Sequence, residues 1–322
     1  MVAVAALLYS AWVGWALTHP RHVGVTSNPS TAHDLIYRPL PATNYLIEPS
    51  ARPLTTSDGV ALRGWILPAP QSQDQEWVGT TPSLWSLKTV IIATDHGQNR
   101  LQQGFPTYDA AARLVAAGYN VILFDARGTG GSGGSAITYG VLEVRDLLAV
   151  VQYALSLGPP GGQIAIWGFG TGAAAAIETA AQSPHVNAVI ADGSYATLDG
   201  YLGRNIPLWT GLPAFPFTGM VRFAMQAETG VSYGAFNPLD AVASLGGTHA
   251  RPLLLVSGAD DTVTPPADAQ ALYAAARDYR SFLLTVPGAG HLQSYSKDPR
   301  EYMSRVLTVL SEMGGPSSSS AA

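Results

Sequence analysis

Short apolar runs rich in β-branched residues alternate along the chain with longer segments whose apolar residues recur at helical spacing. The runs predict strands over residues 62–67, 89–93, 121–124, 163–167, 186–191, 253–256 and 282–286. The helical spacing predicts helices over residues 108–117, 141–155, 171–182, 266–277 and 303–313. Regular alternation of this kind is typical of the α/β class, with a mostly parallel central sheet covered by helices on both faces.

The first twenty residues depart from this pattern. Met1–Leu17 is almost continuously apolar, and no charged side chain occurs up to residue 20. The segment is near the lower length limit for a membrane-spanning helix, and Trp12 and Trp15 suit a membrane interface. We therefore predict a membrane anchor through residues 1–18. Two alternatives stay open: a signal segment, whose cleavage would give a secreted protein, and a buried helix.

The remaining boundaries follow from composition. Residues 21–50 are rich in proline and predict an irregular linker, and residues 51–313 have the size of one α/β domain. Residues 314–322 are of low complexity and predict a disordered tail.

One segment inside the domain, residues 197–247, interrupts the alternation of strands and helices. It carries several large apolar side chains among prolines: Trp209, Phe215, Phe217, Met220, Phe223 and Met225. Long ordered insertions of this kind are usually functional, so we expect a small cap over the carboxyl edge of the sheet. The alternative is a long loop packed on the body. A cap of this composition favours a small apolar ligand of acyl or peptide-like character.

Composition excludes several kinds of site. The chain contains no cysteine, which rules out a disulfide framework, a cysteine nucleophile and cysteine-ligated metals. The net charge is −5 and no basic run occurs, so we expect no nucleic-acid partner. The seven histidines are scattered without ligand spacing, and we predict neither a metal nor a cofactor.

The stretch Gly168-Phe169-Gly170-Thr171-Gly172 lies between a predicted strand and a predicted helix. It fits the strand–turn–helix elbow G-x-S-x-G, except that Gly170 stands at the nucleophile position. It also fits a dinucleotide fingerprint through Gly168, Gly170 and Ala173, with Asp192 about 20 residues on as the acid that would bind a ribose. The local pattern leaves both interpretations open.

More distant residues favour the elbow. Asp261 and His291 each follow a predicted strand, in the order in which α/β-hydrolase elbows are followed by an acid and a histidine. Upstream, the stretch from Asp95 to Arg100 follows an apolar strand. We expect Gln98 and Thr171 to supply the two backbone N–H groups of an oxyanion hole, with His96 and Gly97 supporting that loop.

These motifs together resemble the α/β-hydrolase superfamily, in the branch of membrane-anchored serine aminopeptidase-like and prolyl-oligopeptidase-like bacterial hydrolases. The resemblance rests on Asp58-Gly59-Val60, Gly64-Trp65, His96-Gly97, the Asp125–Gly134 loop, Asp261 and His291, and it covers residues 50–313. It implies the α/β-hydrolase fold and serine hydrolysis of esters or peptides.

The glycine at position 170 departs from that family pattern, because it cannot carry an acyl group. The sequence therefore predicts a catalytically impaired hydrolase or a non-catalytic binding protein. The alternatives are an active hydrolase with a non-standard nucleophile and, less favoured, a dinucleotide-binding protein.

Overall fold

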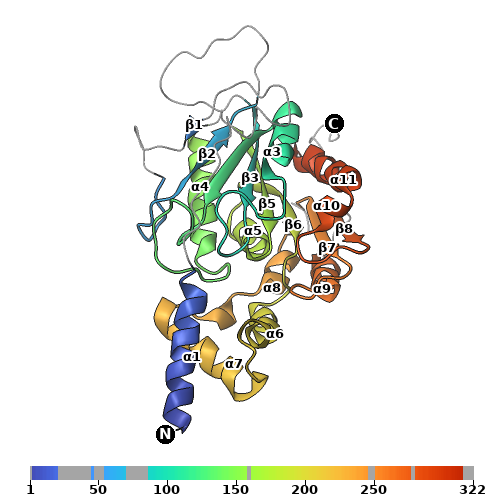
Figure 1. The fold of residues 1–322 in the computed structure, drawn as a ribbon. Helices are drawn as coiled ribbons and strands as arrows, with labels where there is room; N and C mark the ends of the chain where they lie inside the picture. The colour runs from blue at the N-terminus through green and yellow to red at the C-terminus, as the bar shows by residue number, and fades with distance from the viewer. Residues whose placement is uncertain are drawn as a thin grey trace.

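The computed structural model describes residues 2–20, 45–46, 54–69, 86–157, 161–245, 251–276 and 280–314 (Figure 1). Its strands are β1 (Tyr45–Leu46), β2 (Arg63–Leu67), β3 (Lys88–Ala93), β4 (Asn120–Asp125), β5 (Gln163–Phe169), β6 (Val186–Asp192), β7 (Leu253–Gly258) and β8 (Ser281–Val286). They form one sheet in the order β1-β2-β4-β3-β5-β6-β7-β8. The pairs β1–β2 and β2–β4 are antiparallel, and all the other neighbouring pairs are parallel. The predicted mostly parallel sheet is confirmed.

Helices cover both faces of the sheet, as the alternation predicts, and further helices lie beyond its carboxyl edge. They are α1 (Val2–Thr18), α3 (Thr107–Ala116), α4 (Glu143–Leu157), α5 (Thr171–Gln182), α6 (Leu198–Thr210), α7 (Ala214–Thr229), α8 (Pro238–Ala243), α9 (Pro266–Ala276), α10 (Ser294–Lys297) and α11 (Pro299–Ser311). Short 3₁₀ turns follow at Tyr233–Ala235 and Glu312–Gly314. Helices α3 and α11 pack on one face, and α4, α5 and α9 pack on the other.

The strands are buried on both sides, which explains their continuous apolar runs. Along β3, Val90 and Ile92 pack into the core under α3 and α11, whereas Ile91 packs into the core under α4 and α5. All three side chains are fully buried. This arrangement brings the loops at the carboxyl ends of β3, β5, β7 and β8 to one edge of the sheet.

The described part of this segment, residues 197–245, forms helices α6, α7 and α8 rather than a long irregular loop, and residues 246–247 lie outside the described part. The N-terminal helix α1 joins this cap, because it packs against α7, where Gly14 lets α1 approach Ala224 closely. Within the described part of the chain, no helix has both the length and the apolar character needed to cross a membrane. The expected membrane-spanning anchor therefore has no support in the described helices.

Two predicted boundaries fall mostly outside the described residues. Of the predicted linker 21–50, Tyr45–Leu46 is described, and it pairs with Ile66 and Trp65 of β2. The sheet therefore begins inside that segment. Of the predicted disordered tail, residues 315–322 lie outside the described part.

The contact between β5 and α5 depends on Gly168. A Cβ at this position would lie 2.4 Å from the carbonyl oxygen of Gly172 and 2.5 Å from the Cα of Ala173. We expect Gly168→Ala to lower the free energy of unfolding by about 1–3 kcal/mol, because the helix must move away from the strand. Gly203→Ala in α6 is the control, since no atom lies within 4 Å of its added Cβ. It should be neutral or stabilise by up to about 1 kcal/mol. Urea unfolding measures both, and equal effects would contradict the close contact.

Candidate active site

The elbow predicted between strand and helix is present at Gly170, which links β5 to α5. Its backbone has φ 55° and ψ −119°, a conformation that residues with a side chain rarely adopt. Its N–H donates to the carbonyl of Asp192 at 2.8 Å, which holds the turn on the sheet. This sharp turn is the geometry that places a nucleophile at the top of an α/β-hydrolase sheet.

The structure brings Asp261 and His291 into direct contact. Asp261 follows β7, His291 follows β8, and their Oδ2 and Nδ1 atoms are 2.8 Å apart. Thr264 donates from its hydroxyl to the same Oδ2 at 2.8 Å, and its N–H donates to Oδ1 at 2.9 Å. Because Asp261 is buried and multiply hydrogen-bonded, it fixes the imidazole with Nε2 turned toward the elbow.

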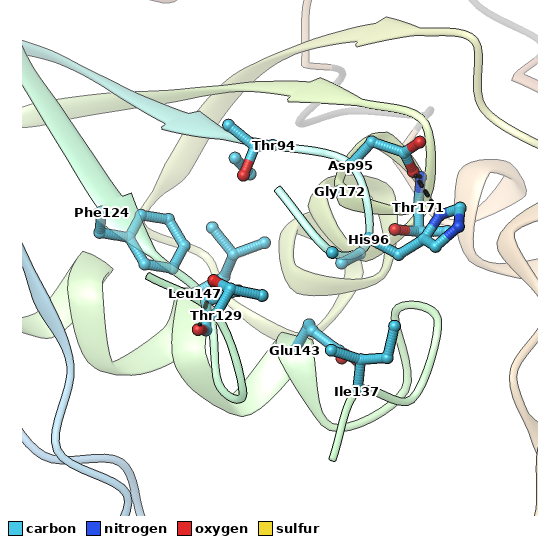
Figure 2. A pocket seen from close by; sticks show the side chains of 14 residues that line it. Thr94, Asp95, His96, Phe124, Thr129, Ile137, Glu143, Leu147, Thr171 and Gly172 are labelled. Atoms are coloured by element: carbon cyan, nitrogen blue, oxygen red, sulfur yellow. Dashed lines mark hydrogen bonds and ion pairs between the residues drawn. The ribbon is translucent and has the colours of Figure 1, made fainter. Parts of the chain in front are cut away.

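The space of the missing elbow side chain is filled by Asp95, which follows β3 and was not singled out from the sequence. A Cβ on Gly170 would lie 2.2 Å from Oδ1 of Asp95. That Oδ1 accepts the N–H of Thr171 at 2.8 Å (Figure 2). The Oδ2 atom of Asp95 lies 3.7 Å from Nε2 of His291. The carboxylate of Asp95 thus fills the nucleophile position. It also accepts the backbone N–H of Thr171, which was predicted to serve the oxyanion hole.

The other predicted site residues, His96, Gly97 and Gln98, lie in the loop that follows β3. The N–H of Gln98 donates to the carbonyl of Asp95 at 3.2 Å, so this amide closes a turn rather than an oxyanion hole. His96 places Nδ1 3.0 Å from Oδ1 of Asp95, and its ring packs against Tyr139 and Trp209. Gly97 has φ +71°, which allows the loop to turn back there.

The loop that carries Asp95 is anchored by a buried ion pair. Asp125, at the end of β4, accepts the backbone N–H of Arg100 at 2.6 Å and also Nε and Nη2 of its guanidinium. Asp125 further accepts the N–H of Gly131, which shapes the glycine-rich loop as a structural turn. The N–H of Asp95 itself donates to the side chain of Gln102 at 2.7 Å. The position of the Asp95 carboxylate is therefore set by packed, satisfied groups.

Electrostatics favour an ionised Asp95 and a protonated His291. Burial tends to raise the pKa of Asp95, but the adjacent His96 and His291 outweigh it and hold the pKa well below its usual range. For His291, burial disfavours the charge, but hydrogen bonding and attraction to Asp261 and Asp95 raise the pKa to about 10. The imidazole therefore lies between two carboxylates that both stabilise its charge.

A pocket of about 380 Å³, its open mouth included, lies beside Asp95 and Thr171. Figure 2 shows Asp95, His96 and Thr171 on one side of it, with Phe124 and Leu147 on the other. Apolar side chains of β4 and α4 therefore line the space next to the carboxylate.

The cap supplies fewer apolar groups to this site than its composition predicts. Trp209 packs on His96, and Tyr201 packs between Tyr195 and His96. By contrast, Phe215 and Phe223 point outward, with 90% and 75% of their surface exposed. Neither phenylalanine lines the pocket, because α7 turns that face away from the sheet.

The residues of the dinucleotide fingerprint are used for packing. Gly168 lets α5 approach β5 closely, since a Cβ there would lie 2.4 Å from the carbonyl oxygen of Gly172. Asp192 is buried and accepts the hydroxyl of Tyr302 at 2.8 Å. Its carboxylate is therefore not presented to a ribose.

We expect Asp95→Asn to lower the pKa of His291 from about 10, because one of its two carboxylates is lost. Imidazole ¹⁵N NMR titration measures this shift. A histidine with a raised pKa stabilises the fold fully below pH about 6.5 and loses that contribution as pH rises through about 10. Unfolding free energies at these two pH values should therefore differ more in the wild type than in the variant. Asp199→Asn, on an exposed ion pair with Arg222, is the control. An unchanged His291 titration in Asp95→Asn would contradict the proximity of the two groups.

Residues 79–305 match the family model described as "Alpha/beta hydrolase family". Among curated relatives, YqkD of Bacillus subtilis is 28% identical over 198 residues, which cover 61% of this chain and 63% of that protein. The match thus spans slightly less than two thirds of the length of YqkD. YfhR of Escherichia coli is 24% identical over 267 residues, covering 82% of this chain and 78% of that protein. Both relatives are named as uncharacterised proteins.

Solved structures share the fold. The Pyrococcus furiosus esterase Pf2001 superposes with a TM-score of 0.69 at 24% identity, covering 93% of this chain and 98% of that one. A puromycin-hydrolysing peptidase of Mycobacterium tuberculosis gives 0.63 at 17% identity, covering 88% of this chain and 41% of that one. The elbow at Gly170, the sheet order and the family model agree, and the chain belongs to the alpha/beta hydrolase family.

Proposed function

We propose that this protein is a hydrolase in which the carboxylate of Asp95 replaces the absent elbow side chain as the nucleophile. The observation that carries the proposal is the position of that carboxylate. It fills the Cβ space of Gly170, accepts the N–H of Thr171 and faces Nε2 of His291. Aspartate carboxylates serve as covalent nucleophiles in several enzyme classes.

The chemistry of a carboxylate selects the substrate class. Attack on an ester or amide carbonyl would form an anhydride, from which the carboxylate leaves again more readily than the alcohol or amine. Attack on a saturated carbon that bears a leaving group forms a stable ester instead. We therefore assign an apolar alkyl electrophile, such as a haloalkane or an epoxide, as the substrate.

In the first step, Oδ2 of Asp95 forms a bond to the substrate carbon as the bond to the leaving group breaks. A halide departs with the electron pair, or an epoxide oxygen takes a proton from Nε2 of His291. The product is an alkyl ester of Asp95. The carboxylate charge that helped to raise the pKa of His291 is then gone, so the imidazole loses its proton more readily and its neutral form becomes available as a base.

Before the second step His291 must be neutral: on the epoxide route it has already given its proton to the substrate, and on the halide route it releases that proton to solvent. Neutral His291 then takes a proton from water, and the hydroxide attacks Cγ of Asp95. The negative charge that develops on Oδ1 is stabilised by the N–H of Thr171, which already donates to that atom at 2.8 Å. The bond between Cγ and the alkyl oxygen breaks, and the alcohol leaves with a proton from His291. The acid proton of Asp95 then returns to His291, which restores the starting state.

Unpartnered polar groups near this centre support a bound ligand. Within the described residues, Nε2 of His291, the hydroxyl of Tyr201 and the hydroxyl of Thr94 are buried without a hydrogen-bond partner. Thr94 lines the pocket, and the pKa of Tyr201 is raised first by burial and then by the charge of Asp95. A leaving group or a water molecule between these atoms would satisfy them.

A second candidate function follows from the same contact. Asp95 can act as a fixed plug that neutralises the oxyanion donor and His291, which leaves a non-catalytic ligand-binding protein. The similar esterase and peptidase folds are compatible with either function. Trapping of the intermediate separates the two.

We expect the His291→Gln variant to accumulate a hexyl ester on Asp95 when it is incubated with 1-bromohexane, because a halide needs no proton to leave. The tryptic peptide Thr89–Arg100 reports the adduct, since Asp95 is its only acidic residue. Wild-type protein turning over 1-bromohexane or 1,2-epoxyhexane in H₂¹⁸O should introduce ¹⁸O into the same peptide. Mass spectrometry detects both.

Asp95→Asn should abolish turnover, and Asp109→Asn on α3 should leave it unchanged. Loss of a covalent nucleophile typically lowers kcat by about a million-fold. If the peptide gains neither the hexyl group nor ¹⁸O with either compound, Asp95 is not the nucleophile for this class and the plug function is favoured.

A serine triad should appear only when Asp95 is also replaced. Gly170→Ser alone should stay inert to a fluorophosphonate probe, because its Cβ would overlap Asp95. The double variant Asp95→Gly/Gly170→Ser removes the overlap, including the 3.0 Å approach to the Asp95 Cβ. We expect it to hydrolyse p-nitrophenyl butyrate at least about 100-fold faster than either single variant. Strong labelling of Gly170→Ser alone would show that Asp95 does not block the elbow.

A further inference from the structure

Exposed apolar side chains gather on three helices at one end of the molecule. Of the eleven large apolar side chains that are exposed in the described residues, nine lie on α1, α6 and α7. Figure 1 shows α1 and α7 side by side at this end, with the N-terminus at the tip. A patch of this kind on a soluble protein marks an interaction surface.

Helix α1 has no polar face that would suit water. Its seventeen residues include no charged side chain. Ser10 and Val13 are buried, and Gly14 meets Ala224 of α7, so only a narrow side of the helix is covered. Most of the remaining circumference is exposed and apolar, including Leu8 at 67% and Trp12 at 59%. A helix that is apolar all round normally lies in a protein core or in lipid.

We infer that α1, α6 and α7 form a membrane-docking surface that enters one leaflet of a lipid bilayer without crossing it. Because α1 packs along α7, which carries the charged side chains of Arg222 and Glu228, the surface is suited to one leaflet rather than to a complete crossing. The aromatic residues Tyr9, Trp12 and Trp15 are of the types that collect at the headgroup level. A second copy of the chain would cover only one side of α1, whereas lipid covers all the exposed sides together.

The charges near this surface are already paired, so docking should depend on apolar burial. Arg222 of α7 pairs with Asp199, and His19 lies 3.7 Å from Glu228. No cluster of lysine or arginine that would attract anionic lipids is present on α1 or α7. Binding should therefore occur on neutral phosphatidylcholine vesicles and should change little with salt.

The docking surface connects directly to the pocket. The carbonyl of Thr18, at the end of α1, accepts the N–H of Ile137 at 2.8 Å, and the carbonyl of Leu17 accepts the hydroxyl of Tyr139. Ile137 lines the pocket, and Tyr139 packs on His96. An apolar ligand dissolved in the bilayer would thus meet the site at the point where the docked helix ends. The inference stands on the cap surface and does not require Asp95 to react.

Flotation of the full chain with phosphatidylcholine vesicles tests the inference. Wild-type protein should float with the vesicles equally at low salt and at about 0.5 M NaCl. Leu8→Glu/Trp12→Glu should weaken partitioning by about 100-fold, because two charges replace apolar contacts with lipid. Leu87→Glu, which changes another exposed leucine away from these helices, is the matched control and should bind like the wild type.

A second readout needs no variant. Vesicles of dibrominated phosphatidylcholine should quench part of the tryptophan fluorescence of the wild type, since Trp12 and Trp15 would contact the acyl chains. Failure to float, equal binding by the double variant, loss of binding at high salt or absence of quenching would each overturn the inference. Sedimentation that gives a dimer without vesicle binding would assign the surface to a second copy instead.

Discussion

A side chain at position 170 and the carboxylate of Asp95 exclude each other, and the rest of the site depends on that constraint. With 2.2 Å between a would-be Cβ and Oδ1, the two groups compete for one volume at the top of the sheet. The glycine is therefore part of an alternative arrangement in which a neighbouring strand supplies the side chain. The N–H of Thr171 and the imidazole of His291 then serve a carboxylate where the family pattern has a hydroxyl.

Such a carboxylate requires a rigid support, because a buried charge is costly unless its partners are fixed. The chain provides the support from β4. Asp125 and Arg100 form a fully enclosed ion pair, and the guanidinium also stacks on Trp65 at 4.5 Å. The loop between Asp95 and Arg100 is thereby held to the neighbouring strand. Its position is thus a consequence of core packing, and it does not depend on a ligand.

Sequence reasoning identified most of the fold and only part of the site. A single sequence is enough to predict the strands and helices, because their hydrophobic periods are local. It also shows the order of Gly170, Asp261 and His291 along the chain. Asp95 was missed because its role arises between two strands that are far apart in sequence, and no local motif records that contact. One signal was available in the sequence: an acid, Asp95, follows one strand, and a glycine, Gly170, follows another strand where a side chain would be expected. The small residue leaves room for the larger one. The outward orientation of Phe215 could not be predicted for a similar reason, since composition does not determine which face of a cap helix turns toward the sheet.

The charge state of His291 links structure to chemistry. An imidazole between two carboxylates is held protonated, and in that state it cannot act as a base. In a serine triad this would be a defect, because the base must act first. With a carboxylate nucleophile the order is reversed: the protonated imidazole meets the leaving group first, and esterification of Asp95 then removes the charge that kept the proton in place. In the proposed mechanism, the two carboxylates beside His291 would therefore provide an acid first and a base second, as hydrolysis through an aspartyl ester requires.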